Sequence, residues 1–151
     1  MISIKNKQRA IPIDRTRLLK QAKLILAALK YSDFELNIVI TTEKDIAVYN
    51  EKFRNKKGPT DVLSFPYHET KAGKRIIAEP DEQILGDLII APAYVARNTK
   101  ELPGSFEDHM RLMLVHGVLH LLGYDHIKDA DYKVMRRKEL ALEKALKAAR
   151  I

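Results

Sequence analysis

The segment between Ser105 and Gly123 constrains the fold more than any other part of the chain. Ser105 and Asp108 have the spacing of a capping box, which begins a helix, and Gly123 is a natural residue to end one. The positions between them are apolar on almost every side of the helix: Met110, Leu112, Met113, Leu114, Val115, Val118, Leu119, Leu121 and Leu122. A helix that is apolar all round has to be buried. The sequence therefore predicts a central helix with the other elements packed around it.

The rest of the chain predicts an α+β arrangement around that helix. Alternating apolar residues predict strands at 2–7, 34–40, 62–65 and 84–90. Capping residues and spaced apolar residues predict helices at 14–30, 42–53, 92–100 and 129–149, and the polar stretch 68–81 is predicted as a loop. No repeat or linker interrupts the 151 residues. We therefore expect one domain, residues 1–151, with a small mixed sheet packed against helices.

Two of these helices carry specific expectations about their faces. In the helix from Thr42, the residues Ile46, Tyr49 and Phe53 are predicted to share a face. In the helix 129–149, the pattern places Val134, Leu140, Leu146 and several alanines on the buried side and leaves Arg136, Arg137 and Lys138 in solvent.

The absence of cysteine narrows the chemistry that this chain can perform. Disulfides, iron–sulfur clusters, thiolate zinc sites and cysteine nucleophiles are excluded, so any metal must be held by His, Asp or Glu. The longest apolar run, 88–96, is about half the length of a membrane span, and the N-terminal residues lack the apolar core of a signal peptide. We expect a cytoplasmic protein without a membrane partner.

Basic residues are concentrated toward both ends of the sequence. Residues 1–30 have a net charge of +7 and residues 129–151 a net charge of +3, whereas residues 31–128 have a net charge of −3. This distribution suits a basic rim for RNA or DNA around a less basic centre. Two solvated amphipathic helices would produce the same distribution, and the charge alone does not separate the two interpretations.

The most informative segment for function is His116–His126, which reads HGVLHLLGYDH. His116 and His120 are four residues apart and project from one face of the central helix. Gly123 allows a sharp turn, so His126 can return toward the first two. A single histidine in such a place is usually an ordinary hydrogen-bonded residue, but three together indicate metal binding. Nitrogen ligands without thiolates suit Zn²⁺, and three protein ligands leave a fourth position for water, as in catalytic zinc sites.

The same spacing occurs in the metzincin protease signature, with one departure at Gly117. Proteases of that class have their general-base Glu at this position. Glycine cannot accept a proton, so peptide hydrolysis by that mechanism lacks its base although the metal ligands are present. The departure indicates a different hydrolytic chemistry.

These residues resemble the hallmark HGxLHLxGYDH of the bacterial YbeY endoribonucleases, also described as rRNA maturation factors. Arg54 followed by 59–66, PTDVLSFP, is similar to a second block of that family, and 86–90, GDLII, is similar to a third. The order and separation of the blocks agree over residues 35–140. The first 30 residues and the loop 68–81 carry no motif that matches.

The resemblance implies a zincin-like α+β fold and a metal-dependent, single-strand-specific endoribonuclease that acts in 16S rRNA 3′-end maturation and ribosome quality control. It implies one zinc ion on His116, His120 and His126, and it gives Arg54 the role of the family's arginine in the active-site cleft. Single-stranded RNA, most naturally rRNA, and the small ribosomal subunit are the implied partners, and no DNA substrate is expected. The guanidinium of Arg54 suits a phosphodiester transition state, although a cation at the end of a helix is its ordinary structural role.

Several other residues near these motifs are given structural roles. Asp125 has the features of a turn residue or of a hydrogen-bond partner to a ligand, and Asp61 and Ser64 those of residues that shape a strand. His109 lies about 10 Å along the helix from His116 and is expected to be solvated. Tyr67, Tyr94 and Tyr124 are candidate contacts for unstacked bases, but partly buried packing is their commoner role.

Three functional classes follow from the sequence: a metallo-ribonuclease, a metal-dependent hydrolase of another substrate, and a noncatalytic ribosome-associated factor with structural zinc. The first is favoured. Structural zinc sites normally have four protein ligands, whereas three histidines are present here. The basic balance is a modest argument against a substrate other than RNA.

Overall fold

The computed structural model describes all residues 1–151 and has the α+β composition predicted from the sequence. Its strands are β1 (Ile2–Asn6), β2 (Glu35–Ile40), β3 (Val62–Pro66) and β4 (Ile84–Ile90). Its helices are α1 (Arg15–Ala28), α2 (Glu43–Arg54), α3 (Pro92–Asn98), α4 (Phe106–Leu121) and α5 (Asp129–Ala148). A single 3-10 turn, Pro80–Glu82, lies in the predicted loop before β4.

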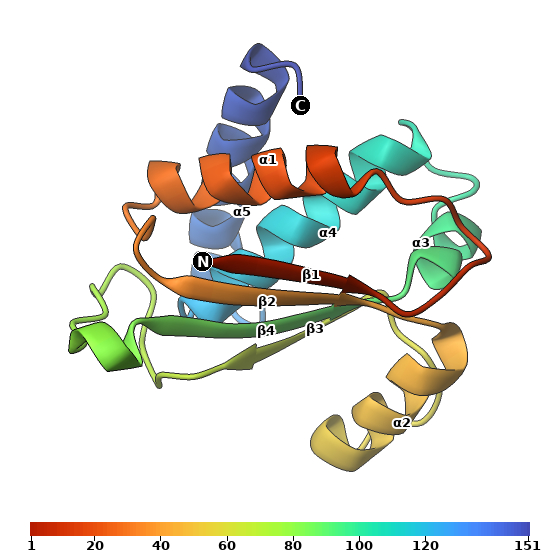
Figure 1. Cartoon of the computed structure of the whole chain (residues 1–151), viewed down its shortest axis with the longest axis horizontal. Helices are drawn as coiled ribbons and strands as arrows, with labels where there is room; N and C mark the ends of the chain where they lie inside the picture. Colours follow the sequence, from red (N-terminus) through yellow and green to blue (C-terminus); the bar gives the residue numbers. More distant parts are fainter.

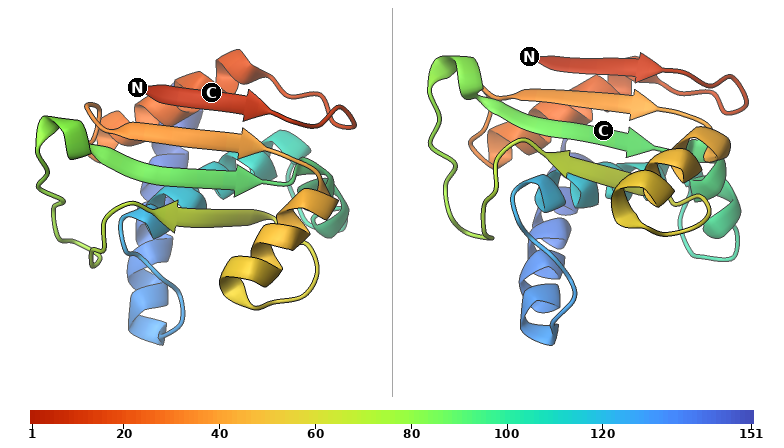
Figure 2. Two further views of the ribbon diagram at one scale, coloured as in Figure 1. Left: turned by 60° about the horizontal axis from the view of Figure 1, so that its bottom comes forward. Right: turned by 90° about the horizontal axis from the view of Figure 1, so that it is seen from below.

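The four strands form one mixed sheet in the order β1-β2-β4-β3 (Figures 1 and 2). β1, β2 and β4 are parallel, whereas β3 runs antiparallel to β4, from the pair Val62–Ile90 to the pair Pro66–Gly86. β3 is therefore an edge strand, and one side of its backbone faces away from the sheet. Residues 55–61 connect α2 to this edge strand, and Asn50 Nδ2 of α2 donates to the Gly58 carbonyl of that connection over 2.9 Å.

The two faces of the sheet are covered unequally. α1, α4 and α5 lie over one face and form the main core with it, whereas α2 lies on the opposite side (Figure 1). A smaller cluster of Ile46, Leu63, Ile89 and Ala91 attaches α2 to that second face. Ile46 is fully buried in this cluster, and Asn50, one turn later, is the other buried residue of α2.

α4 is the central helix that the sequence predicts. Its capping box is complete, because the Asp108 N–H donates to Ser105 Oγ over 3.1 Å and the Ser105 N–H donates to Asp108 Oδ2 over 3.0 Å. The hydrogen bond from Ser105 lowers the pKa of Asp108. Leu114, Val115, Val118, Leu119 and Leu121 are fully buried. Neither α4 nor any other helix combines the length and the apolar character that crossing a bilayer requires.

α5 corrects one expectation about its buried face. Leu146 is buried as predicted, but Val134 and Leu140 are 41% and 53% exposed, and none of the alanines of this helix is buried. The buried residues of α5 are Met135, Glu139, Leu142 and Leu146. The buried stripe contains a glutamate where an apolar residue would be expected, so the apolar pattern alone gives the wrong rotation of the helix.

Candidate metal centre

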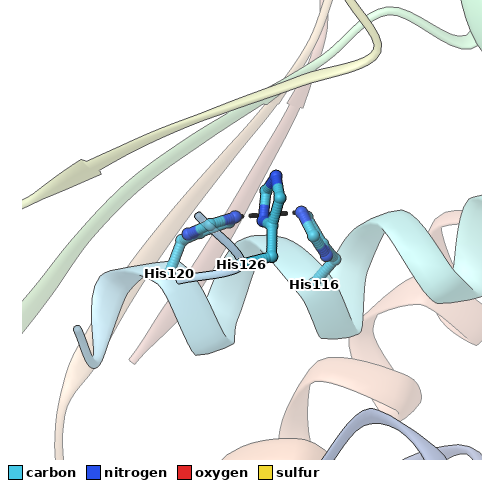
Figure 3. Close-up of side chains that lie close together, drawn as sticks. All are labelled: His116, His120 and His126. Atoms are coloured by element: carbon cyan, nitrogen blue, oxygen red, sulfur yellow. Dashed lines mark hydrogen bonds between the residues drawn. The ribbon is translucent and has the colours of Figure 1, made fainter. Parts of the chain in front are cut away.

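Three histidine side chains converge beside the C-terminal half of α4 (Figure 3). His116 and His120 project from the helix, and His126 comes from the turn that follows it. The Nε2 atoms of His116 and His120 are 2.9 Å apart, and one nitrogen from each of the three rings lies within 4.8 Å of the others. The structure thus brings together the three histidines that the sequence selects.

The turn after α4 explains how His126 reaches the other two rings. Gly123 adopts φ +88°, and its N–H donates to the His120 carbonyl over 3.0 Å. A Cβ at this position would lie only 2.4 Å from the Thr70 carbonyl oxygen, so glycine is required both by conformation and by space. Asp125 Oδ1 then accepts the N–H of Ile127 over 3.3 Å, the turn role expected for Asp125.

A carboxylate from α5 orients the first histidine. Glu139 Oε2 lies 2.9 Å from His116 Nδ1, and the Glu139 side chain is only 9% exposed. Burial raises the pKa of Glu139, but His116 and Arg136 together lower it below its usual range. The ionised carboxylate holds the proton of His116 on Nδ1, so the lone pair of Nε2 points into the cluster. The sequence pattern did not single out this residue, although a glutamate at a buried helical position is a detectable signal.

His120 is held in its neutral form at physiological pH. Burial, followed by the proximity of His116 and His126, lowers its pKa to about 4, and the charge of Arg54 contributes in the same direction. A neutral imidazole keeps a lone pair for a metal, whereas imidazolium has none.

The donor set fits one metal ion. Nitrogens at about 2.0–2.1 Å from a tetrahedral ion lie about 3.3 Å apart, which is within the spread of the three rings. His116 already has the carboxylate partner that ligating histidines commonly have. No fourth His, Asp or Glu joins the cluster, so three protein ligands would leave one coordination position open.

The cluster opens into a cleft of about 700 Å³ between α2, β3 and α4. Its walls are formed by Phe53, Arg54, Lys56, Thr60, Asp61, Val62, Leu63, Ser64, Phe65 and the three histidines. Arg54 is the last residue of α2, and Asn55 ends the helix with φ +53°. The Arg54 side chain is exposed and forms no salt bridge within the protein. It therefore lies in the cleft with its guanidinium available.

Two other residues of the cleft wall have structural roles. Asp61 Oδ1 accepts the N–H of Val62 over 2.7 Å at the start of β3, and Ser64 Oγ donates to the Gly117 carbonyl over 3.0 Å. The second bond joins β3 to α4 across the floor of the cleft. These contacts agree with the shaping roles predicted for Asp61 and Ser64.

Gly117 is the position at which the spacing departs from the metzincin signature. A Cβ here would lie 2.9 Å from Leu88 Cδ2 and 3.3 Å from Val62 Cγ2. A side chain at this position would press on the ends of the Leu88 and Val62 side chains, so the close approach of α4 to the sheet favours glycine here.

The remaining candidates lie outside the cluster. His109 is near the start of α4, and the expectation that it is solvated is wrong for its Nε2, which is buried without a hydrogen-bond partner. Tyr124 is 9% exposed and belongs to the core, as expected, and Tyr94 is half-buried against the cluster under α2. Tyr67 is 54% exposed and packs its ring against His68 rather than in the core.

Comparison with known proteins shows which family this chain belongs to. The family model described as "Endoribonuclease YbeY" matches residues 3–147. A relative of that name from Aquifex aeolicus is 36% identical over 97% of this chain and 93% of its own length, and one from Homo sapiens is 36% identical over 92% and 84%. A solution structure from Thermotoga maritima superposes with a TM-score of 0.63 at 26% identity, over 95% of this chain and 87% of that one. The chain belongs to the YbeY endoribonuclease family.

Proposed function

We propose that the protein is a zinc-dependent, single-strand-specific endoribonuclease that acts in the cytoplasm on the 3′ end of 16S rRNA and in ribosome quality control. The observation that carries the proposal is the convergence of three histidine nitrogens within 4.8 Å, in a cleft that also contains Arg54. Membership of the YbeY family and the name endoribonuclease borne by the relatives support the reaction class. The rRNA target and the ribosomal role rest on the family resemblance alone.

The three histidines are the proposed metal ligands, and each has a local reason to serve as one. His116 is oriented by Glu139, His120 stays neutral above about pH 4, and His126 is delivered by the turn at Gly123. A zinc ion held there would supply Lewis acidity and a bound water with a pKa of about 7. Nitrogen donors without sulfur or additional carboxylates favour zinc over magnesium or calcium.

Arg54 is the proposed phosphate-binding residue. A phosphodiester gathers negative charge on its nonbridging oxygens in the transition state, and a guanidinium offers paired donors to those oxygens. Arg54 forms no internal ion pair that would have to break first. Its position at the end of α2 also satisfies the helix-end role, and the two roles are compatible.

The site geometry also bears on the alternative functions. A structural zinc would normally be closed by a fourth protein ligand, but the cluster has three and opens into a cleft. Peptide hydrolysis of the metzincin type lacks its glutamate, because Gly117 stands at that position and packs closely against Leu88 and Val62. The exposed lysine and arginine side chains of α1 and α5 form the proposed surface for binding the small ribosomal subunit.

The deciding experiment measures zinc content and cleavage of single-stranded RNA on identically purified variants. We expect one zinc and cleavage in the wild type, loss of both in His120→Ala, and retained zinc with a roughly 10²- to 10³-fold lower kcat in Arg54→Ala. Arg97→Ala is the matched control, because Arg97 is an exposed helical arginine that pairs with Glu43 outside the cleft. Cleavage that persists unchanged in His120→Ala would mean that the activity belongs to a contaminating nuclease and would refute the proposal.

A further inference from the structure

A row of three aromatic rings leads away from the cleft along the outside of α2. Phe65 on β3 and Phe53 on α2 both line the cleft, and their ring centroids are 5.3 Å apart in an edge-to-face arrangement. Tyr49, one turn earlier on α2, is parallel to Phe53 with a centroid distance of 6.1 Å. Tyr49 and Phe53 share a face, as their spacing predicts, but they are 40% and 56% exposed.

Packing does not account for this exposure. α2 is already attached to the sheet by Ile46, which is fully buried against Leu63 and Ile89. Phe53 and Tyr49 lie outside that cluster and keep much of their surface in water. Large aromatic side chains grouped on a surface commonly mark a place where a ligand or partner binds.

The charges beside the row indicate which kind of partner fits. Residues 52–57 contain four basic residues and no acidic one. Arg54 and Lys56 line the cleft, and Lys52 Nζ lies 5.3 Å from the centroid of the Phe53 ring. All four basic residues are exposed and none forms a salt bridge. Exposed aromatic rings between unpaired cations are the pattern of a surface that binds single-stranded nucleic acid.

We propose that Tyr49, Phe53 and Phe65 form a base-stacking platform for the nucleotides that flank the scissile phosphate, with Lys52 and Lys56 on the neighbouring phosphates. The inference rests on the proposed function and specifies how the strand is held. A base stacks on the exposed surface of Phe53 after the flexible Lys52 ammonium has moved from the ring to a phosphate. Bases in a duplex have both faces covered by their neighbours, so this platform selects single strands.

The chain contains no tryptophan, which makes a direct test possible. Phe53→Trp introduces a single fluorophore on the platform, and Leu102→Trp introduces one at a 54%-exposed site on the loop before α4. The zinc-loaded full-length variants are titrated with an oligouridylate whose phosphorothioate linkages resist cleavage. We expect strong quenching of the indole fluorescence in Phe53→Trp and little change in Leu102→Trp. An equal response in the two variants would overturn the proposal.

Steady-state cleavage provides the second arm. Phe53→Ala is expected to raise KM about 5- to 150-fold, because one stacked base contributes that much to binding, and to change kcat much less. Phe53→Tyr should restore KM, since it keeps the ring. An unchanged KM in both Phe53→Ala and Tyr49→Ala would overturn the platform. Both side chains are exposed, so the substitutions leave the core intact.

Two further probes separate bases from charge. An abasic strand keeps the phosphates and should neither quench the fluorescence of Phe53→Trp nor bind as tightly as the oligouridylate; equal affinity would overturn the stacking. Polyglutamate tests an acidic peptide as the partner, and competition as effective as that of RNA would also overturn it.

The same measurements separate this inference from the proposed function. If the wild type cleaves RNA and Phe53→Ala and Tyr49→Ala behave identically to it, only the platform fails. If the zinc-loaded Phe53→Trp variant is quenched as expected but the wild type does not cleave, only the nuclease assignment fails.

Discussion

Replacing Glu139 tests whether a carboxylate on α5 sets the metal affinity of a site on α4. The bond to be broken joins Glu139 Oε2 to His116 Nδ1 over 2.9 Å, and the Glu139 side chain is 9% exposed. Removing such a partner of a ligating histidine typically weakens metal binding roughly 10- to 100-fold, or about 1.4–2.7 kcal/mol. Glu139→Gln keeps an acceptor oxygen without the charge, so we expect it to weaken metal binding by about 10-fold. Glu139→Ala removes the acceptor and also leaves Arg136 without the carboxylate that lies 3.6 Å away, so we expect it to weaken metal binding by about 100-fold.

The assay is competition for zinc between metal-free protein and a chromophoric chelator at fixed pH. The matched control is Glu143→Gln on the same helix, whose Oε2 accepts from the buried Arg111 over 3.1 Å. It should lower the free energy of unfolding by about 1–3 kcal/mol and leave zinc affinity within about twofold. Affinity that falls equally in the Glu139 and Glu143 variants would show that general stability, and not the orientation of His116, sets metal binding. Wild-type affinity in Glu139→Ala would refute the reasoning outright.

Three further predictions concern stability. The free energy of unfolding of the metal-free protein should decrease as pH falls from about 6.5 to about 4, because the pKa of His120 is near 6.5 in the unfolded chain and about 4 in the folded one. Urea unfolding at several pH values should show a weaker pH dependence in His120→Asn. Gly123→Ala should destabilise more than Gly73→Ala, since both have left-handed φ but only Gly123 has backbone within 2.4 Å of the new Cβ; equal thermal shifts would contradict the clash. Ser105→Ala should cost about 1 kcal/mol in chemical unfolding through loss of the cap on α4, and a neutral result would contradict it.

The histidine cluster could be predicted because its geometry is local. The four-residue spacing of His116 and His120 places them on one helical face wherever that helix packs, and Gly123 specifies the turn that returns His126. The boundaries of α4 were also readable, since the cap residues act on neighbouring backbone groups. Each of these features is specified by residues that are close together in the sequence.

The apolar pattern of α5 does not predict which face of the helix is buried, because that face includes a polar residue that contacts α4. Glu139 occupies a position that an apolar residue would normally take, since it forms a hydrogen bond to His116 across the interface. Arg111 and Glu143 form a second buried polar contact between the same two helices. A hydrophobic pattern assigns such positions to solvent, so it does not indicate that Glu139 is buried beside His116.

The composition of the cleft wall could not be predicted from the sequence either. The ring centroids of Phe53 and Phe65 are 5.3 Å apart because β3 pairs with β4 at the edge of the sheet and α2 packs beside it. Strand order is set by pairing between distant segments, and periodicity along one segment carries no information about it. The sequence therefore predicted Arg54 as a candidate by resemblance, but not which aromatic side chains share its cleft.

The position of Glu139 on α5 has a consequence for the time at which the site is completed during synthesis. All three histidines precede α5 in the chain, so they leave the ribosome before the carboxylate that orients His116. A nascent chain that has reached residue 128 carries the ligands without Glu139, and its α4 lacks the cover that α5 provides. We expect a chain that ends before α5 to bind a metal ion more weakly than the finished protein. The site of this endoribonuclease is therefore complete only once its last helix has packed against α4.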